Sequence, residues 1–229
     1  MRILIITPAY NEQANIRRVV DNLTENFPDY DYVVVNDGSS DRTSAICHEL
    51  GYNIVDLPVN LGLSGAFETG MRYAERYGYD AAIQIDADGQ HRPEFIPDMV
   101  KKLEAGYDIV IGSRFAARKK PFSARMIGSR LIAGCIRLTT GKVITDPTSG
   151  MRLYNRKMIG EFAKNLNYGP EPDTISFLIR QGARVTEVQV QMDERTEGQS
   201  YLSFTKSIFY MLRMTLSILI IQNFRIKRR

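Results

Sequence analysis

Two aspartates separated by a single residue are a notable feature of this chain, because carboxylates so close together repel unless a cation or hydrogen-bond donors satisfy them. Asp86 and Asp88 lie in the stretch IDADGQ, directly after an apolar run, and Gln90 follows. Asp and Gly also favour an ordinary turn at this point. Mg²⁺ is typically held by one or two carboxylates together with substrate phosphate oxygens and water. The pair is therefore a candidate metal site, with the Gln90 amide as a further oxygen donor.

Four other apolar runs are also followed by polar segments. These segments read TPAYNE at 7–12, NDGSSD at 36–41, NLGLSG at 60–65 and GSR at 112–114. In an open parallel sheet, ligands bind outside the carboxyl ends of the strands. Five polar strand ends together predict a ligand crevice, in which Asp37 would accept hydrogen bonds from a base or a ribose.

The apolar runs that position these residues have the length and composition of buried strands. They occupy residues 2–7, 32–35, 53–57, 81–85 and 108–112. Helical patterns alternate with them, beginning with apolar residues from Ile16 to Phe27 at spacings of three and four and continuing at 41–50, 64–77 and 93–104. This alternation predicts an α/β fold with a mostly parallel sheet flanked by helices. Further along, we expect helices at 123–140 and 172–181, a strand at 184–191 and a long helix from about residue 203.

Bulk properties narrow the function classes. The 229 residues, 44% hydrophobic and 24% charged, are typical of a globular domain, and the net charge of +4 indicates no nucleic-acid partner. Cys47 and Cys135 lack metal-ligand spacing and are expected to be core residues in a reducing compartment. The first residues lack the apolar core of a secretory signal.

Common nucleotide and metal motifs are absent from the expected places. TPAYNE is not the G-x-G-x-x-G of a dinucleotide fold, and the P-loop pattern is missing. An EF-hand counted from Asp86 would have His91 where glycine is needed and Pro97 where the bidentate glutamate belongs. We interpret His91 as a residue that starts the following helix.

The ordered motifs resemble those of the family 2, GT-A-type glycosyltransferases, and most closely the dolichol-phosphate mannose synthase-like branch. They read PAYNE, VVVNDGSSD, NLGLSGAFETG, IDADGQ, GSRF, TDPTSGMRLYN and RTEGQS, and they span residues 8–200 in the family's order. Each motif alone is weak, but the ordered series is specific. The resemblance implies a GT-A (Rossmann-like) catalytic domain over residues 1–202.

On the donor side, the resemblance implies that one group of residues contacts the nucleotide and a second holds Mg²⁺ or Mn²⁺ against the diphosphate. The nucleotide group is Pro8, Tyr10, Glu12, Asn36, Asp37 and Asp86, and the metal group is Asp86, Asp88 and Gln90. Many relatives carry an aspartate where this chain has Asn36, so this position accepts a hydrogen bond but adds no charge. A uridine nucleotide is the family expectation, and a guanosine nucleotide stays open.

On the acceptor side, the resemblance and its spacing imply that Arg114, Arg125 and Ser129 meet a phosphate. Arg195 and Ser200, in RTEGQS, would clamp phosphates when their loop closes. Tyr201 stands where many relatives have a basic residue after this serine.

The implied activity is inverting transfer of a sugar from a nucleoside-diphosphate sugar to a polyprenyl phosphate, in which Asp88, Arg114 and Arg125 take part. GPEPD at 169–173 departs from the lipid-phosphate branch, so Glu171 or Asp173 would be a general base if the acceptor is a sugar hydroxyl. A sugar nucleotidyltransferase would need a glycine-rich loop after the first strand, which is missing. A non-catalytic nucleotide-binding role is the remaining alternative.

The C-terminal segment 203–229 is apolar and ends in RIKRR. Lys206 and Arg213 interrupt it, and the uncharged apolar run 214–221 after them is well short of the ~20 residues that span a bilayer. Its pattern favours an amphipathic helix on an anionic membrane surface, at the cytoplasmic face. Packing against the core of the domain, and docking on a small membrane protein or on a second copy, are the alternatives.

Overall fold

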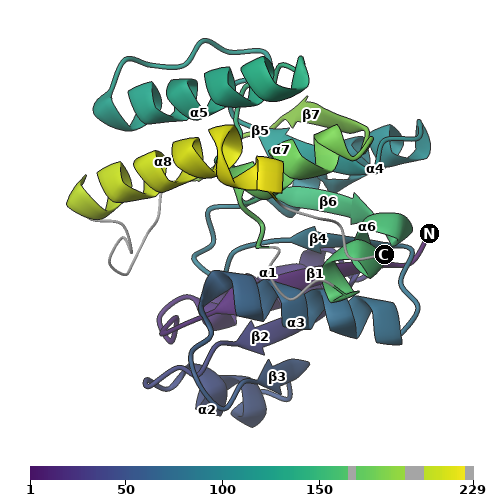
Figure 1. Ribbon diagram of the computed structural model, residues 1–229. Coiled ribbons are helices and arrows are strands. Elements are labelled where there is room, and N and C mark those ends of the chain that lie inside the picture. The colour runs from purple at the N-terminus through teal and green to yellow at the C-terminus, as the bar shows by residue number, and fades with distance from the viewer. Residues whose placement is uncertain (165–168, 194–203, 225–229) are drawn as a thin grey trace.

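The computed structural model describes residues 1–164, 169–193 and 204–224 (Figure 1). Its strands are β1 (Ile3–Ala9), β2 (Asp31–Asn36), β3 (Ile54–Asp56), β4 (Ala81–Gln84), β5 (Ile109–Ser113), β6 (Arg152–Asn155) and β7 (Val185–Gln189). They form one sheet in the order β3-β2-β1-β4-β6-β5-β7. All pairs are parallel except those of β6, which runs antiparallel between β4 and β5. The expected mostly parallel α/β fold is confirmed.

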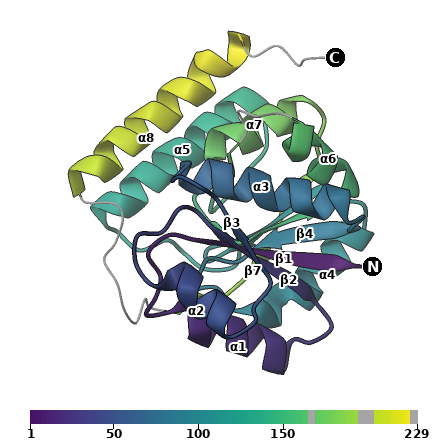
Figure 2. The same cartoon turned by 90° about the horizontal axis from the view of Figure 1, so that it is seen from below.

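Helices cover both faces of this sheet (Figure 2). One layer contains α3 (Gly62–Arg76), α5 (Ala124–Thr140), α6 (Arg156–Lys164), α7 (Pro172–Arg180) and α8 (Phe204–Leu219). The opposite layer contains α1 (Ile16–Asn26), α2 (Thr43–Glu49) and α4 (Ile96–Glu104), the last preceded by the short η1 (Pro93–Phe95). Side chains of β1 alternate between the two faces of the sheet: Leu4 and Ile6 pack against the first helix layer, and Ile3 and Ile5 pack against the second. Because both faces are covered, the strands are apolar throughout.

The sequence pattern did not predict β6 and α6. β6 has only four residues and begins with Arg152, a residue that is rarely buried without polar partners. Arg152 is nevertheless 1% exposed, because its guanidinium donates to the carbonyl oxygens of Ser149 (2.8 Å) and Pro147 (2.7 Å). The insertion of β6 between β4 and β5 separates the two strand ends that carry Asp86 and Arg114.

The last described helix, α8, packs beside α5 and α7, and a short turn η2 (Ile221–Phe224) follows it (Figures 1 and 2). Met214 and Ile218 of α8 are buried in the core shared with these helices. Of the helices in the described ranges, none is long and apolar enough to span a bilayer.

Candidate active site

The aspartate pair lies in a tight turn at the carboxyl end of β4. Gly89 has a φ of +76°, a left-handed conformation that glycine adopts without strain, and a side chain there would collide with the guanidinium of Arg18. Arg18 in turn donates to the carbonyl oxygen of Asp88 at 3.3 Å. Asp88 Oδ1 accepts the backbone N–H of Gln90 at 3.0 Å. The turn thus fixes both carboxylates at the edge of the sheet, where they are partly exposed.

Two side chains hold Asp86 from behind. Gln84 Nε2 donates to Asp86 Oδ1 at 2.7 Å, and the backbone N–H of Asp86 donates to His91 Nδ1 at 3.0 Å. Because Nδ1 accepts, the ring proton of neutral His91 resides on Nε2, which lies 3.7 Å from Asp86 Oδ2. The side chain of His91 is 4% exposed. The sequence suggested that His91 starts the following helix, but that helix begins at Pro93 with Arg92 as its N-cap. His91 instead positions Asp86.

Gly150 completes this support. A Cβ at this position would lie 2.9 Å from Asp86 Oδ2 and 3.2 Å from His91 Cε1, so the backbone approaches the carboxylate as closely as only glycine allows. Nothing in the sequence pattern connected residue 150 with Asp86.

The donor set suits a metal that completes its coordination with substrate. No group of three or more His, Cys, Asp or Glu side chains that could hold a metal is found in the described part of the chain. Two carboxylates nevertheless fit Mg²⁺ or Mn²⁺ when diphosphate oxygens and water supply the other ligands. The Gln90 amide donates to the carbonyl oxygen of Asp193 at 3.2 Å, so its nitrogen is oriented toward that residue.

The residues predicted to meet the nucleotide lie at the neighbouring ends of β1 and β2. Tyr10 is 41% exposed, whereas Asp37 is 3% exposed and its Oδ1 accepts the backbone N–H of Leu61 at 2.7 Å. Pro8 is half-buried within β1, and Glu12 Oε2 accepts from Asn15 Nδ2 at 2.8 Å. These side chains border one edge, as expected for parallel strands.

Asn36, also predicted to meet the nucleotide, is engaged in hydrogen bonds within the protein. It is 3% exposed, its Nδ2 donates to Asp56 Oδ1 at 2.7 Å, and its Oδ1 accepts the backbone N–H of Ser39 at 3.2 Å. The loops after β1 and β2 are joined instead by Asn11, whose φ is +55° and whose Oδ1 accepts backbone N–H groups of Ser40 and Asp41. Asn36 and Asn11 thus shape the loops.

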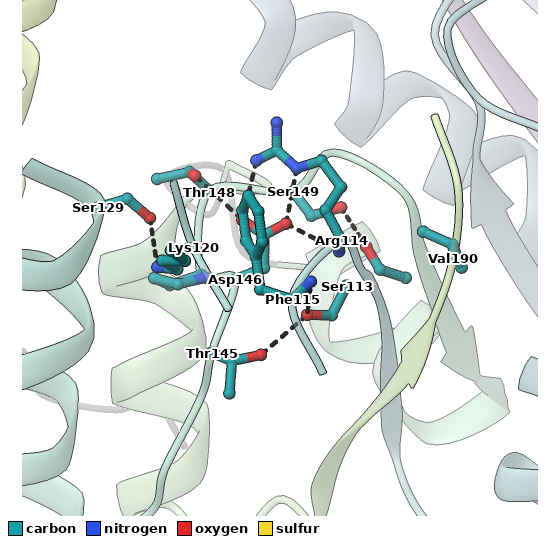
Figure 3. Close-up of polar contacts among 12 residues, drawn as sticks. Ser113, Arg114, Phe115, Lys120, Ser129, Thr145, Asp146, Thr148, Ser149 and Val190 are labelled. Atoms are coloured by element: carbon teal, nitrogen blue, oxygen red, sulfur yellow. Dashed lines mark hydrogen bonds and ion pairs between the residues drawn. The ribbon is translucent and has the colours of Figure 1, made fainter. Parts of the chain in front are cut away.

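Arg114 follows β5 and forms a forked ion pair with Asp146 (Figure 3). Its Nε and Nη2 donate to the two carboxylate oxygens at 2.7 and 2.9 Å, and its backbone N–H also donates to Oδ2 at 3.1 Å. The side chain of Asp146 is fully buried, and that of Arg114 is 25% exposed. Two of the five N–H donors of the Arg114 guanidinium are therefore engaged within the protein.

Ser129, the other described side chain predicted to meet the acceptor phosphate, lies on α5. It is 2% exposed, and its Oγ accepts from Lys120 Nζ at 2.9 Å (Figure 3). The sequence had placed Lys120 only in a general basic cluster. The side chain of Arg125, and all of Arg195 and Ser200, lie outside the described residues.

Glu171 and Asp173, the candidate general bases, fasten α8 to the domain. Glu171 Oε2 accepts from the hydroxyl of Tyr210 at 2.5 Å, and Asp173 Oδ2 accepts from Ser217 Oγ at 2.6 Å. Gln222 also donates to the carbonyl oxygen of Asp173. Burial and the adjacent Glu171 carboxylate raise the pKa of Tyr210, which keeps its hydroxyl protonated as a donor.

The sheet order, with helices on both faces and a two-carboxylate turn at one strand end, is that of a GT-A fold. The sequence matches the family described as Glycosyl transferase family 2 over residues 4–162, and the chain belongs to this family.

Relatives and solved structures agree with this assignment. The undecaprenyl-phosphate mannosyltransferase of Micrococcus luteus is 32% identical over 89% of this chain and 88% of its own. The polyprenol monophosphomannose synthase of Mycolicibacterium smegmatis is 31% identical over 88% of this chain and 81% of its own. The structure of glucosyl-3-phosphoglycerate synthase from Mycobacterium tuberculosis with Mn²⁺, UDP-glucose and phosphoglyceric acid has a TM-score of 0.72 at 18% identity, covering 99% of this chain and 81% of that one. At this sequence identity, the similarity to that structure shows that the two proteins share a fold.

Proposed function

We propose that this protein transfers a sugar from a nucleoside-diphosphate sugar, with UDP favoured over GDP, to the phosphate of a polyprenyl phosphate. The observation that carries this proposal is the pairing of a two-carboxylate turn at one strand end with a strongly basic region, containing Arg114 and Lys120, at another. The polyprenyl-phosphate transferases named above, at more than 30% identity over most of both chains, support the same acceptor.

The turn at β4 would orient the donor diphosphate. Asp86, held by Gln84 and His91, and Asp88, held by the Gln90 N–H, would bind Mg²⁺ or Mn²⁺ together with diphosphate oxygens. When bound, such a cation offsets the charge that develops on the leaving nucleoside diphosphate. The protein's own part is to hold both carboxylates in place before the substrate arrives.

The transfer itself needs no base if the acceptor is a phosphate. A phosphate monoester has a second pKa near 6, so it is largely dianionic at neutral pH and already nucleophilic. One of its oxygens attacks the anomeric carbon from the face opposite the diphosphate. The bond from that carbon to the diphosphate oxygen breaks, its electron pair leaves with the nucleoside diphosphate, and the configuration inverts. No proton is transferred.

A sugar hydroxyl as acceptor would have to lose a proton, and this is the alternative reaction. Glu171 and Asp173 would be its bases. Because both carboxylates accept hydrogen bonds from α8, through Tyr210 and Ser217, their placement favours a role in fastening that helix. This supports the phosphate acceptor over the hydroxyl.

We further propose that the protein acts at the cytoplasmic face of the membrane, as a peripheral protein. Exposed apolar side chains on the adjacent helices α5 and α8 support a position on a lipid surface. They are Ile127, Leu131, Leu138, Phe209, Leu212 and Leu216.

The test is to incubate the protein with Mn²⁺, polyprenyl phosphate and a panel of radiolabelled nucleotide sugars, and to ask which label enters the organic phase. We expect one label to be transferred, and we expect Asp88→Ala to abolish this transfer while the protein stays folded. Transfer by Asp88→Ala at the normal rate would refute the metal site. A product in which the sugar is linked to a sugar hydroxyl would refute the acceptor.

A further inference from the structure

The turn that carries Asp86 and Asp88 borders a cavity of about 280 Å³, which lies between α1 and the start of η1. Gly89 and His91 of the turn are part of the cavity wall. Side chains normally fill the interior of a protein closely, and this filling keeps a loop in one position. Because the turn lacks such filling on this side, the polar contacts around the cavity have a larger part in holding it.

The main chain just after β7 pairs with this turn. His91 and Met192 form an antiparallel β-bridge. Next to it, the N–H of Asp193 donates to the carbonyl oxygen of Gln90 at 2.9 Å, and Gln90 Nε2 donates to the carbonyl oxygen of Asp193 at 3.2 Å. The fold thus joins two segments that are 103 positions apart in the sequence.

An ion pair reinforces this contact. Arg92 Nε donates to both carboxylate oxygens of Asp193 at 2.9 Å, and Arg92 Nη2 also donates to Oδ1. The two side chains are 40% and 47% exposed, so the pair contributes little to overall stability. A forked pair nevertheless fixes the relative orientation of its two partners. Because Arg92 follows Gln90 by two residues, the pair keeps Asp193 against the turn.

These contacts set the orientation of the Gln90 amide. Asp193 engages Nε2, which leaves Oε1 on the other side of the amide for a further ligand, and no hydrogen bond among the described residues uses this oxygen. A neutral amide oxygen is a ligand that hard cations accept. Without Asp193 the amide would be free to rotate and to present its nitrogen, which is a donor and binds no cation.

From these contacts we infer that Asp193 and Arg92 are positioning residues of the metal site. Asp193 orients the Gln90 amide so that Oε1 is available to the cation, and Arg92 holds Asp193 in place. The inference rests on the proposed metal site at Asp86 and Asp88. It adds that a segment after β7 completes the support of this site, although β6 and β5 lie between β4 and β7 in the sheet.

Binding of Mn²⁺ to the full chain tests the inference without turnover. Mn²⁺ is titrated in the presence of UDP, and the free ion is followed by electron paramagnetic resonance. Arg92→Met and Asp193→Ala each remove the ion pair and leave the backbone groups in place. We expect each to weaken Mn²⁺ binding about three- to tenfold, at or below the low end for groups that orient metal ligands, because the backbone pairing remains. The double variant should bind no more weakly than either single variant, since both remove the same interaction.

The direction of the two effects separates positioning from a simple effect of charge. If the side chains acted on the cation only through their charges, removal of the cationic Arg92 would strengthen Mn²⁺ binding and removal of the anionic Asp193 would weaken it. Positioning requires that both removals weaken it. Arg92→Lys keeps the charge but lacks the fork, so its affinity should lie between those of Arg92→Met and the unaltered protein.

Arg17→Met is the matched control. Arg17 is an exposed arginine of α1 that pairs with Asp21 at 3.5 Å, and its replacement should leave Mn²⁺ binding unchanged. Because Arg92 and Asp193 are both partly exposed, their variants should stay folded, and each tests the inference independently of the other.

Mn²⁺ binding by Arg92→Met that is as tight as in the unaltered protein, or tighter, would overturn the inference, and so would unchanged binding by Asp193→Ala. Absence of Mn²⁺ binding by the unaltered protein would overturn the proposed metal site and the inference with it. Failure of the proposed function has a different signature, namely Mn²⁺ binding that depends on Arg92 without transfer of sugar to polyprenyl phosphate.

Discussion

Replacement of His91 by leucine should weaken metal binding without removing a metal ligand. His91 Nδ1 accepts the backbone N–H of Asp86 at 3.0 Å, and leucine leaves this N–H without a partner in a buried place. A buried unsatisfied donor costs about 1–3 kcal/mol. For a domain of this size, the melting temperature should therefore fall by about 2–12 °C. Because groups that orient metal ligands commonly affect affinity by about 10–100-fold, we expect a loss of Mn²⁺ affinity in that range.

The assay is a titration of Mn²⁺ into the protein with UDP present, followed by the electron paramagnetic resonance signal of free Mn²⁺. His91→Asn should recover much of the affinity, because its Oδ1 accepts a hydrogen bond at about the position of Nδ1. The chain has only one other histidine, His48, which is exposed and pairs with Asp56, so His48→Leu is the matched control. If His91→Leu melts early but binds Mn²⁺ as tightly as the unaltered protein, His91 supports the fold and does not position Asp86.

Three further predictions concern other parts of the structure. Asp146→Asn should destabilise the protein by about 3 kcal/mol, since it leaves Arg114 without its counter-charge, and calorimetry should find much of this loss reversed in the double variant with Arg114→Gln. Tyr210→Phe should increase hydrogen exchange in α8, because it removes the donor to Glu171; unchanged exchange would mean that this contact does not fasten the helix. Burial raises the pKa of Cys47 to about 11, so at pH 8 roughly one thiol in a thousand is a thiolate, and disulfide reagents should label it only after unfolding.

The sequence predicts the strands and the turn that carries Asp86 and Asp88 well because their signals are local. Strands of four to seven residues are recognisable in the sequence as apolar runs that end in polar residues. The IDADGQ turn needs only its own glycine to form. His91 was misjudged for a related reason. Its proximity to Asp86 arises from the left-handed turn at Gly89, which brings together two residues that no helical or strand period relates.

The contacts of Arg114, Glu171 and Asp173 could not be predicted because their partners are distant in sequence. Arg114 and Asp146 are 32 positions apart, and nothing in either motif indicates that one neutralises the other. Lys120 lies in a run of three basic residues, so its contact with Ser129 cannot be distinguished from the solvated charges beside it. Glu171 and Asp173 are candidate bases because GPEPD departs from the pattern of the lipid-phosphate branch. Their partners lie on α8, about 40 residues away, and appear only in the folded chain.

The segment from Asp146 to Arg152 connects the loop after β5 with the turn that carries Asp86. Asp146 fixes Arg114 in that loop, Gly150 packs against Asp86, and the buried guanidinium of Arg152 holds the carbonyl oxygens of Pro147 and Ser149 between them. Ser149 Oγ also donates to the carbonyl oxygen of Gly112 at 2.6 Å, which ties the segment to β5. Because backbone carbonyls and buried charges fix its course, the segment would set the separation of donor and acceptor in the proposed reaction before either binds. In a direct displacement between two anions that repel each other, a separation fixed in advance lowers the barrier by reducing the entropy that must be lost.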